Sequence, residues 1–377
     1  MQEDFHYYAT YCAAYLAGFS PEEALEIGYA AAYVDFCTAT MLKRLKAPIS
    51  AATTQMNMEI ADARTDIIGL MDITRIWASF HFLPYDLYAE KAHCSKRYLH
   101  RYRLICNSNG DLLVDTVMLA KGRSLPAMGL AMHVLADTWA HKYFAGTTST
   151  VINSPTHFID LNRNTKIEFH HSSSKADNLE AGVYNNAFYT MSETSIFSLG
   201  HGRAGHIPDY GYMRYSFMPS WADYRIFVKD NPSDYYSAFC QMLYALIFYH
   251  DGGNFEKDRY AEDVAEPYRN DIMTIINTQA LMVNDEWREF AIRLTGFDPG
   301  FFDILRYNDE YINASEEKKD DTFLGKFIIA ALAQKSMVTA KIFQSGNPLA
   351  GYSIDYNLKG LKGIKDFWKI IDLYKEQ

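Results

Sequence analysis

Three residues with the chemistry of metal ligands recur at a spacing of four: His133, Asp137 and His141. Residues four apart on an α-helix lie on the same face, so the spacing predicts a row of ligands along one helix. The row rises about 12 Å from His133 to His141, whereas a zinc–nitrogen bond is only about 2 Å long. One ion cannot hold both histidines, so the spacing favours a site with several ions. The alternative is a set of side chains that only hydrogen-bond one another inside a helical core.

A carboxylate in an apolar stretch is the second candidate. Asp35 stands among alanine, tyrosine, valine and phenylalanine, in a helix predicted to begin at Ser20 and Pro21 and to run to about Leu45. Burying a carboxylate is costly unless it is paired or bound to a metal. A solvent-facing place on an amphipathic helix is the alternative. His81 stands between two phenylalanines and, from its neighbours alone, is interpreted as a core histidine.

The segment 200–209 gathers three glycines with His201, Arg203, His206 and Asp209. Glycines let the backbone turn sharply or approach another group closely. Arg203 could pair with a phosphate as well as with a carboxylate, because its guanidinium is a planar fork of donors. So many ligand-type side chains in ten residues indicate a functional site.

Helical periodicity covers most of the remaining chain. It predicts helices around residues 185–199, 233–250, 261–283, 285–295, 322–343 and 359–375, and a long polar loop with room for short strands over 147–180. Because no internal repeat or low-complexity linker divides the 377 residues, one domain is expected. Its site-bearing part covers about residues 1–225, and a helical part over about 226–377 is expected to pack on it.

Composition and charge narrow the function classes. The formal net charge of −10 argues against broad contact with nucleic acid, which depends on lysine and arginine neutralising phosphates. No run approaches the ~20 apolar residues of a membrane helix, and the acidic start of the chain is unlike a secretory signal. A cytoplasmic protein without a membrane span is therefore expected. The five cysteines form no C-x-x-C pair, which excludes a thiolate zinc ribbon.

The order of these histidines and aspartates resembles that of a known family. Five segments within about residues 4–225 carry the resemblance: Asp4-Phe5-His6-Tyr7-Tyr8, Val34-Asp35, Phe80-His81-Phe82, the helix from His133 to His141, and Gly200-His201-Gly202 with Pro208-Asp209. In this order the chain resembles the zinc-dependent phospholipase C and S1/P1 nuclease superfamily, and within it the uncharacterised bacterial DUF6765 branch.

The resemblance implies an all-α fold, a multi-helix bundle with a polynuclear metal site of two to three zinc ions between its helices. It assigns the ligands in three sets: Asp35, His81 and His133; His6 and Asp137; and His141, Asp209 and either His201, which is favoured, or His206. The secreted enzymes of this superfamily use the amino group and carbonyl of an N-terminal tryptophan as further ligands. Asp4 is expected to replace that ligand here.

The function expected from the resemblance is metal-assisted hydrolysis of a phosphodiester, as in a phospholipase C or a related phosphoesterase. Asp35 would orient or deprotonate the attacking water, and Arg203 would neutralise the phosphate. The expected substrate is a small intracellular phosphodiester or a phospholipid. Two alternatives remain open: a single-strand nuclease-like activity, and a catalytically weak or inactive binding or structural protein in which the ions mainly hold helices together.

Overall fold

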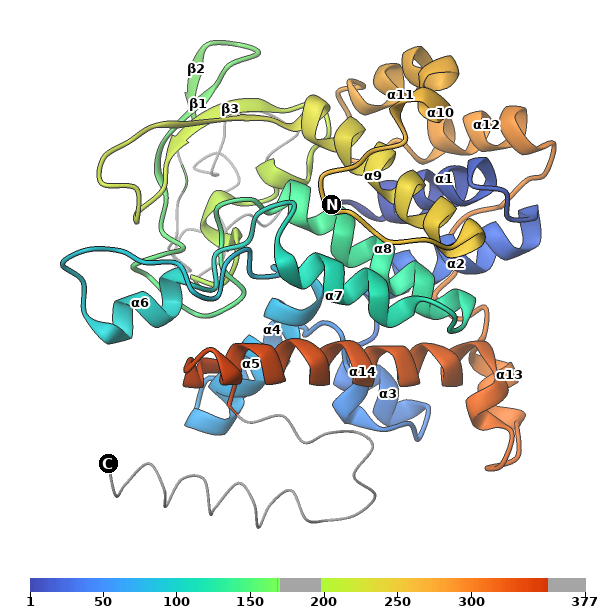
Figure 1. Cartoon of the computed structure of the whole chain (residues 1–377), viewed down its shortest axis with the longest axis horizontal. Helices are drawn as coiled ribbons and strands as arrows, with labels where there is room; N and C mark the ends of the chain where they lie inside the picture. The colour runs from blue at the N-terminus through green and yellow to red at the C-terminus, as the bar shows by residue number, and fades with distance from the viewer. Residues whose placement is uncertain (168, 170–197, 352–377) are drawn as a thin grey trace.

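Helices make up most of the structure, which is a computed structural model that describes residues 1–167, 169 and 198–351 (Figure 1). The chain begins with the short π-helix η1 (Phe5–Ala9), which continues into α1 (Thr10–Leu16). Helix α2 (Pro21–Tyr33) begins as the sequence predicts. The Ser20 hydroxyl accepts a hydrogen bond from the Glu23 backbone N–H, and the Glu23 carboxylate accepts one from the Ser20 N–H.

The helix predicted from Pro21 to Leu45 is interrupted, which corrects that expectation. After α2 the chain turns over residues 34–36, and α3 (Ala39–Arg44) starts afresh. Two hydrogen bonds accompany the interruption. The Thr38 hydroxyl caps α3 by accepting from the Met41 N–H, and the Thr53 hydroxyl donates to the Val34 carbonyl at 2.6 Å. Asp35 therefore sits on a turn rather than on a helix face.

Helix α8 (Leu125–Ala140) is the centre of the helical part (Figure 1), and its residues 126–140 are all buried. It packs against α2, α7 (Asp111–Ala120), α9 (Asn231–Asp251) and α14 (Phe323–Gln344). The contact with α2 is close because position 129 is glycine. A Cβ there would lie 2.2 Å from the carbonyl oxygen of Ile27. The row of ligand-type side chains is thus carried by a helix that is enclosed on several sides.

The remaining helices follow the predicted pattern in the second half of the chain, where α9, α11, α12 and α14 fall within or close to the expected ranges. Their bounds, with those of the other short helices, are α4 (Asn57–Ala63), α5 (Ile67–Phe80), α6 (Lys96–Tyr102), α10 (Glu262–Ala265), α11 (Arg269–Ile276), α12 (Asn284–Thr295), α13 (Asn308–Asn313), η2 (Ile49–Ala51), η6 (Gly202–Ala204), η7 (Ile207–Asp209), η8 (Glu266–Tyr268), η9 (Lys319–Asp321) and η10 (Pro348–Ala350). The predicted helices over 185–199 and 359–375 lie outside the described residues, except for positions 198 and 199.

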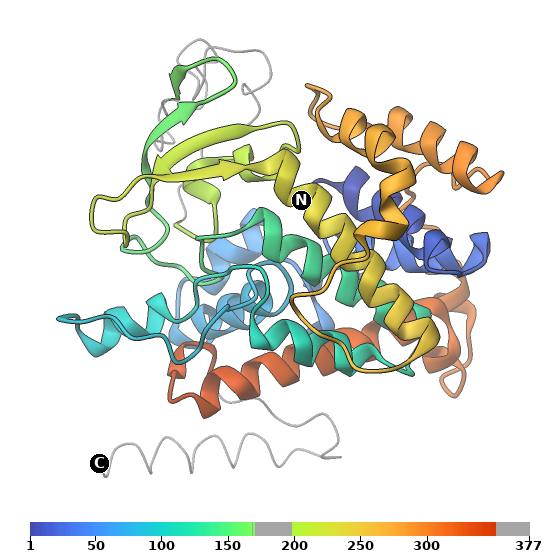
Figure 2. The ribbon, with the colours of Figure 1, turned by 45° about the horizontal axis from the view of Figure 1, so that its top comes forward.

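A four-stranded antiparallel sheet corrects the expectation of an all-α fold. Its strands β1 (Thr156–Asp160), β2 (Thr165–Ile167), β3 (Arg214–Met218) and β4 (Phe227–Asp230) pair in the order β2-β1-β3-β4. Figure 2 shows the sheet at one end of the helical part. Aromatic rings of β1 and β3 pack on one another beneath it; Phe158 and Phe217 stack with ring centroids 5.4 Å apart. Strands of three to five residues are too short to give a clear alternation in sequence.

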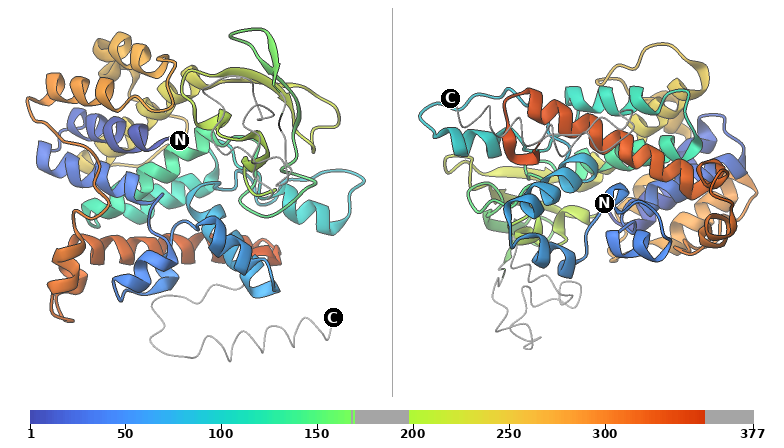
Figure 3. Two further views of the ribbon diagram at one scale, coloured as in Figure 1. Left: turned by 180° about the vertical axis from the view of Figure 1, so that it is seen from behind. Right: turned by 90° about the horizontal axis from the view of Figure 1, so that it is seen from below.

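Helix α14 is the one element, among the residues described, whose length and composition would let it cross a membrane. Figure 3 shows it crossing the lower side of the helical part. The mean hydropathy of its most apolar stretch of 18 residues is 1.2, and 56% of that stretch is buried inside the protein. Such burial is typical of a core helix in a soluble protein. The cytoplasmic location and the single-domain organisation stay predictions, although α9 does pack on α8 as expected for the C-terminal part.

Candidate metal centre

Side chains from five parts of the chain converge at the site. His6 comes from η1, Asp35 from the turn after α2, and His81 from the C-terminal end of α5. Helix α8 contributes His133 and Asp137 and ends at His141, which caps it, while His201 and Asp209 come from the segment of η6 and η7. The side chains of His6 and His133 are fully buried, and that of Asp137 is 1% exposed. Water is therefore largely excluded from the middle of the site.

Within this site the ligand-type atoms form three groups. The atoms of each group lie within 4.8 Å of one another. The groups are His6, His133 and Asp137; Asp35, His81 and His133; and His141, His201 and Asp209. These groups match the three sets that the resemblance assigns, with the addition of His133 beside His6 and Asp137. Buried histidine and aspartate groups that could each hold a metal ion are therefore present.

Asp137 lies at the centre of the histidines. Its Oδ1 is 3.2 Å from His6 Nε2, and its Oδ2 is 3.1 Å from His133 Nε2, 3.3 Å from His81 Nδ1 and 3.5 Å from His141 Nδ1. Two ligand atoms on one tetrahedral zinc lie about 3.3 Å apart, given zinc bonds of about 2.0–2.1 Å. The separations of Asp137 from His6, His81 and His133 are thus those of atoms that share an ion, and its two oxygens face different histidines.

The third group is built around Asp209. Its Oδ1 is 2.9 Å from His141 Nε2, and its Oδ2 is 3.3 Å from His201 Nε2. His206 lies 3.5 Å from the same oxygen through Nδ1, but its side chain is 48% exposed and it belongs to none of the three groups. The geometry therefore favours His201 over His206 as the histidine of this group.

Four of the histidines are oriented by backbone carbonyl groups on the side away from the carboxylates. The four contacts are His81 Nε2 to Thr53 O at 3.0 Å, His133 Nδ1 to Ala31 O at 2.9 Å, His141 Nδ1 to His81 O at 2.6 Å, and His201 Nδ1 to Gly205 O at 2.6 Å. A carbonyl oxygen only accepts, so the ring nitrogen that faces it carries the hydrogen. Metal-binding histidines in proteins are held by the same kind of contact.

The opposite ring nitrogen then has a lone pair and no hydrogen in the neutral imidazole. At His81, His133 and His201 it faces a carboxylate oxygen at 3.1–3.3 Å, and at His141 it faces one at 2.9 Å. A carboxylate oxygen is likewise an acceptor. Two acceptors at this distance repel one another unless a proton or a metal ion lies between them. At His81 burial would lower the pKa, but the contacts with Asp137 and Asp35 outweigh it and raise the pKa, which favours a proton there. Burial lowers the pKa of His201 to about 4, so the arrangement at His201 fits a bound metal ion.

His6 has no carbonyl partner. Both of its ring nitrogens are buried and neither has a hydrogen-bond partner among the described residues. Its ring stacks on that of His133, with centroids 3.8 Å apart. Buried polar atoms in proteins are nearly always paired, so an orphaned imidazole needs an explanation. A metal ion bound at Nε2, next to Asp137, would provide one.

The protonation states of two histidines and two aspartates in the site are those that metal binding requires. Burial lowers the pKa of His6 to about 3 and that of His201 to about 4, so both are neutral at pH 7 and keep a free lone pair. Burial alone would raise the pKa values of Asp137 and Asp209, but interactions with His141 and His201 respectively, and with the Met1 ammonium, hold both pKa values well below the ordinary one. Neutral imidazoles and ionised carboxylates are the forms that bind metals.

The α-amino group of Met1 also lies in the site. It donates to Asp137 Oδ1 at 2.6 Å and is 3.4 Å from Asp209 Oδ1. Burial lowers the pKa of this amine, but the carboxylates of Asp137, Asp209 and Asp35 outweigh it and raise the pKa to about 10. The expectation that Asp4 takes the place of an N-terminal amino group overlooked this amine, and the four orienting carbonyls were not predicted either. Backbone groups give no signal in residue types, so only the fold reveals them.

Two predicted site residues lie elsewhere. The Asp4 carboxylate accepts hydrogen bonds from the Phe5 N–H at 2.8 Å and the Val283 N–H at 2.7 Å, and it belongs to none of the three groups. Both carboxylate oxygens of Asp4 are engaged by backbone N–H groups, which corrects the expectation that Asp4 replaces a metal ligand. Arg203 donates to the Ser198 hydroxyl at 2.8 Å and lines a separate pocket. Among the described residues no contact joins it to the carboxylates of the site, so the structure does not support its predicted place beside the metals.

Comparison with known proteins gives a family and no function. The profile of DUF6765, described as a family of unknown function, matches residues 1–342. No curated protein and no solved structure matches the chain.

Proposed function

We propose that this chain, which belongs to the DUF6765 family of unknown function, is a zinc-dependent hydrolase of phosphodiester bonds. One observation carries the proposal. Carbonyl-oriented histidines direct lone pairs at the carboxylates of Asp137 and Asp209, at separations typical of atoms that share an ion.

Zinc is the metal that the donors favour. Imidazole nitrogens and carboxylate oxygens with short mutual separations suit small four-coordinate ions, whereas calcium prefers six to eight oxygen ligands. Magnesium likewise binds mostly oxygen and water. Three groups of donors support an expectation of two to three zinc ions per chain.

Phosphodiester hydrolysis is the reaction that adjacent ions serve well. When bound, such ions polarise phosphate oxygens, lower the pKa of a water molecule and balance charge on the leaving oxygen. Asp137 is placed to bridge, because its two oxygens face different histidines. The resemblance to the phospholipase C and P1 nuclease superfamily supports the same reaction. A single-strand nuclease-like activity remains an alternative within it.

Asp35 is the residue proposed to act on the water. Its side chain is 31% exposed, more than any other carboxylate of the three groups, and its Oδ1 lies 3.7 Å from His81 Nδ1. It therefore marks the side from which a substrate and water reach the site. There it can orient a water molecule and accept its proton. The proposed substrate is a small phosphodiester or a phospholipid head group.

Metal content and turnover test the proposal. Protein purified without added metal or chelator is analysed by elemental mass spectrometry and assayed with bis(p-nitrophenyl) phosphate. We expect two to three zinc ions per chain, and turnover that a chelator removes and zinc restores. Less than one tightly bound ion per chain would overturn the metal site as described.

A structural role for the ions is the second candidate. The near-complete burial of His6, His133 and Asp137 favours it, because closed metal sites commonly stabilise a fold. Asp35→Asn separates the two. An enzyme loses turnover while its melting temperature falls by no more than a few degrees. A structural protein shows no zinc-dependent turnover in the wild type, and the same substitution leaves it without an activity to lose.

A further inference from the structure

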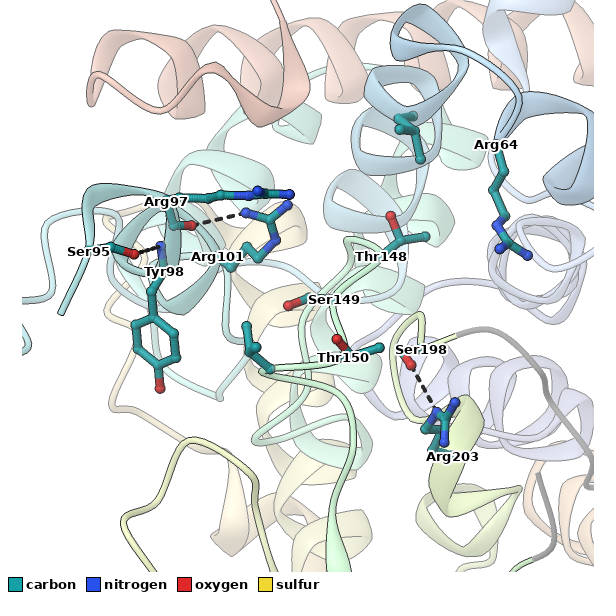
Figure 4. Close-up of a pocket in the computed structure, with 12 residues that line it drawn as sticks. Arg64, Ser95, Arg97, Tyr98, Arg101, Thr148, Ser149, Thr150, Ser198 and Arg203 are labelled. Atoms are coloured by element: carbon teal, nitrogen blue, oxygen red, sulfur yellow. Dashed lines mark hydrogen bonds between the residues drawn. The ribbon is translucent and has the colours of Figure 1, made fainter. Parts of the chain in front are cut away.

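We infer that a pocket lined by none of the residues of the metal centre binds a small molecule that carries two or more phosphate groups. The cavity has a volume of about 680 Å³ and is lined by Arg64, Arg97, Arg101 and Arg203 together with several hydroxyl groups (Figure 4). Among the described residues that line it, none carries a carboxylate. Four arginines around one cavity stand out in a chain whose formal net charge is −10.

Three of these arginines have no carboxylate partner among the described residues. Among the residues that the structure describes, no carboxylate forms an ion pair with Arg97, Arg101 or Arg203. The Nε of Arg203 is held by the Ser198 hydroxyl, which is neutral. A guanidinium has five N–H donors, so most of those on Arg97, Arg101 and Arg203 remain available to a ligand.

Helix α6 places two of the charges next to one another. Arg97 and Arg101 stand four residues apart, and Arg101 Nη1 donates to the Arg97 carbonyl at 3.0 Å. Like charges at this spacing destabilise a helix. Burial and the nearby Arg97 lower the pKa of Arg101. An anion bound between the two guanidinium groups would remove this repulsion.

Hydroxyl groups lie between the two sides of the pocket. Figure 4 shows Arg97 and Arg101 on one side, Arg64 and Arg203 on the other, and the segment with Ser149 between them. The Ser149 hydroxyl is buried and has no hydrogen-bond partner among the described residues. An unpaired buried hydroxyl at the wall of a basic cavity is a donor that a ligand would satisfy.

The dimensions indicate the class of ligand. Small-molecule pockets in proteins have volumes of roughly 300–1,000 Å³, and this one is larger than a single phosphate needs. Arginine binds phosphate in a bidentate manner, and here arginines approach from two sides. A compact polyphosphorylated molecule would contact both. This inference does not rest on the proposed hydrolase activity.

Calorimetric titration with inorganic tripolyphosphate tests the inference. We expect saturable binding by the wild type and at least tenfold weaker binding by Arg97→Gln/Arg101→Gln. The control is Lys43→Gln/Arg44→Gln, which removes the same charge from α3, outside the pocket lining, and is expected to bind as the wild type does. Zinc content is measured before and after, because tripolyphosphate also chelates metals. Chelation at the metal centre contributes equally to all three proteins, so the comparison isolates the pocket.

Ser149→Ala provides a second test. Its melting temperature is expected to be unchanged or slightly higher, since an unpaired buried hydroxyl is removed, while tripolyphosphate binding weakens. Equal affinity in the wild type and the double arginine variant, or no saturable binding by the wild type, would overturn the inference. Tighter binding of a single-stranded oligonucleotide, lost in the same arginine variant, would show that the pocket serves a polymer instead and would also overturn it.

Discussion

Removal of the central carboxylate should empty more than one metal position. Asp137 belongs to the group of His6 and His133, and its Oδ2 also lies 3.3 Å from His81 Nδ1 in the neighbouring group. An asparagine at position 137 is neutral and presents a single oxygen, so it cannot serve both. We expect Asp137→Asn to lower the zinc content by two ions per chain. Asp209→Asn is the matched control and is expected to lower it by one.

The effect on stability follows from the ions lost. Each ion bound at a hundredfold excess over its Kd stabilises the folded state by about 2.7 kcal/mol, so two contribute about 5 kcal/mol. For a chain of 377 residues unfolding as one unit, with an entropy of about 2.1 cal/mol/K per residue, this corresponds to a fall in melting temperature of roughly 7 °C. The melting temperature of the Asp209→Asn control should fall by about half as much.

Elemental mass spectrometry and differential scanning calorimetry on the same samples measure both quantities. Circular dichroism confirms that each variant is folded before its metal content is compared. The reasoning is refuted if Asp137→Asn keeps the zinc content of the wild type. It is also refuted if Asp209→Asn loses as many ions as Asp137→Asn does.

Three further predictions concern the fold and its pH dependence. Burial lowers the pKa of Lys335 to about 8, below its ordinary 10.5, so wild-type stability should rise between pH 8 and 10.5 as the side chain loses its proton. Lys335→Met should remove that rise and increase the free energy of unfolding at pH 7 by roughly 2 kcal/mol, after the loss of the hydrogen bond to the Ala52 carbonyl is subtracted. Urea unfolding at pH 7 and pH 10 measures both effects. The same pH dependence in the variant and the wild type would count against a buried charge at this position. Gly129→Ala should cost about 1–3 kcal/mol in the same assay, because its Cβ would meet the Ile27 carbonyl; a neutral result would mean that α2 and α8 separate easily. Chelator-treated protein should lose stability as the pH falls from 6.5 to 4, because the unfolded state protonates His6 and His201 before the folded state does. His201→Gln should lose roughly 3 kcal/mol less than the wild type over this range, and an equal loss in the two proteins would assign it to other groups.

The row on α8 could be predicted from sequence because it depends only on helical geometry. Asp35 was placed on a continuous helix, and its true position depends on the Thr53 hydroxyl, which caps the end of α2 from elsewhere in the chain. The short strands were missed as a sheet for a similar reason. Their pairing joins segments that are far apart in sequence, and no strand is long enough to show its own period.

The orientation of the histidines could not be predicted at all. It depends on backbone carbonyls, such as those of Ala31 and Thr53, which any residue type would supply. The arginine pocket is similar. Arg203 was singled out for phosphate, but its partners on α6 carry no sequence signal that links them to it. Sequence thus indicated which side chains have ligand chemistry, while the fold decides which of them act together.

The placement of the candidate ligands has a consequence for folding and for the effect of metal loss. His6 and Asp209 lie roughly 200 residues apart in sequence, and bound ions would tie the segments that carry them to α8. Such ions would act as cross-links, comparable to disulfide bonds that close very long loops, in a chain whose five cysteines are all free. They can form only after distant segments have met, so metal would be acquired late in folding. Loss of metal would loosen the N-terminal segment and the glycine-rich segment together, and protease sensitivity at both should rise in step.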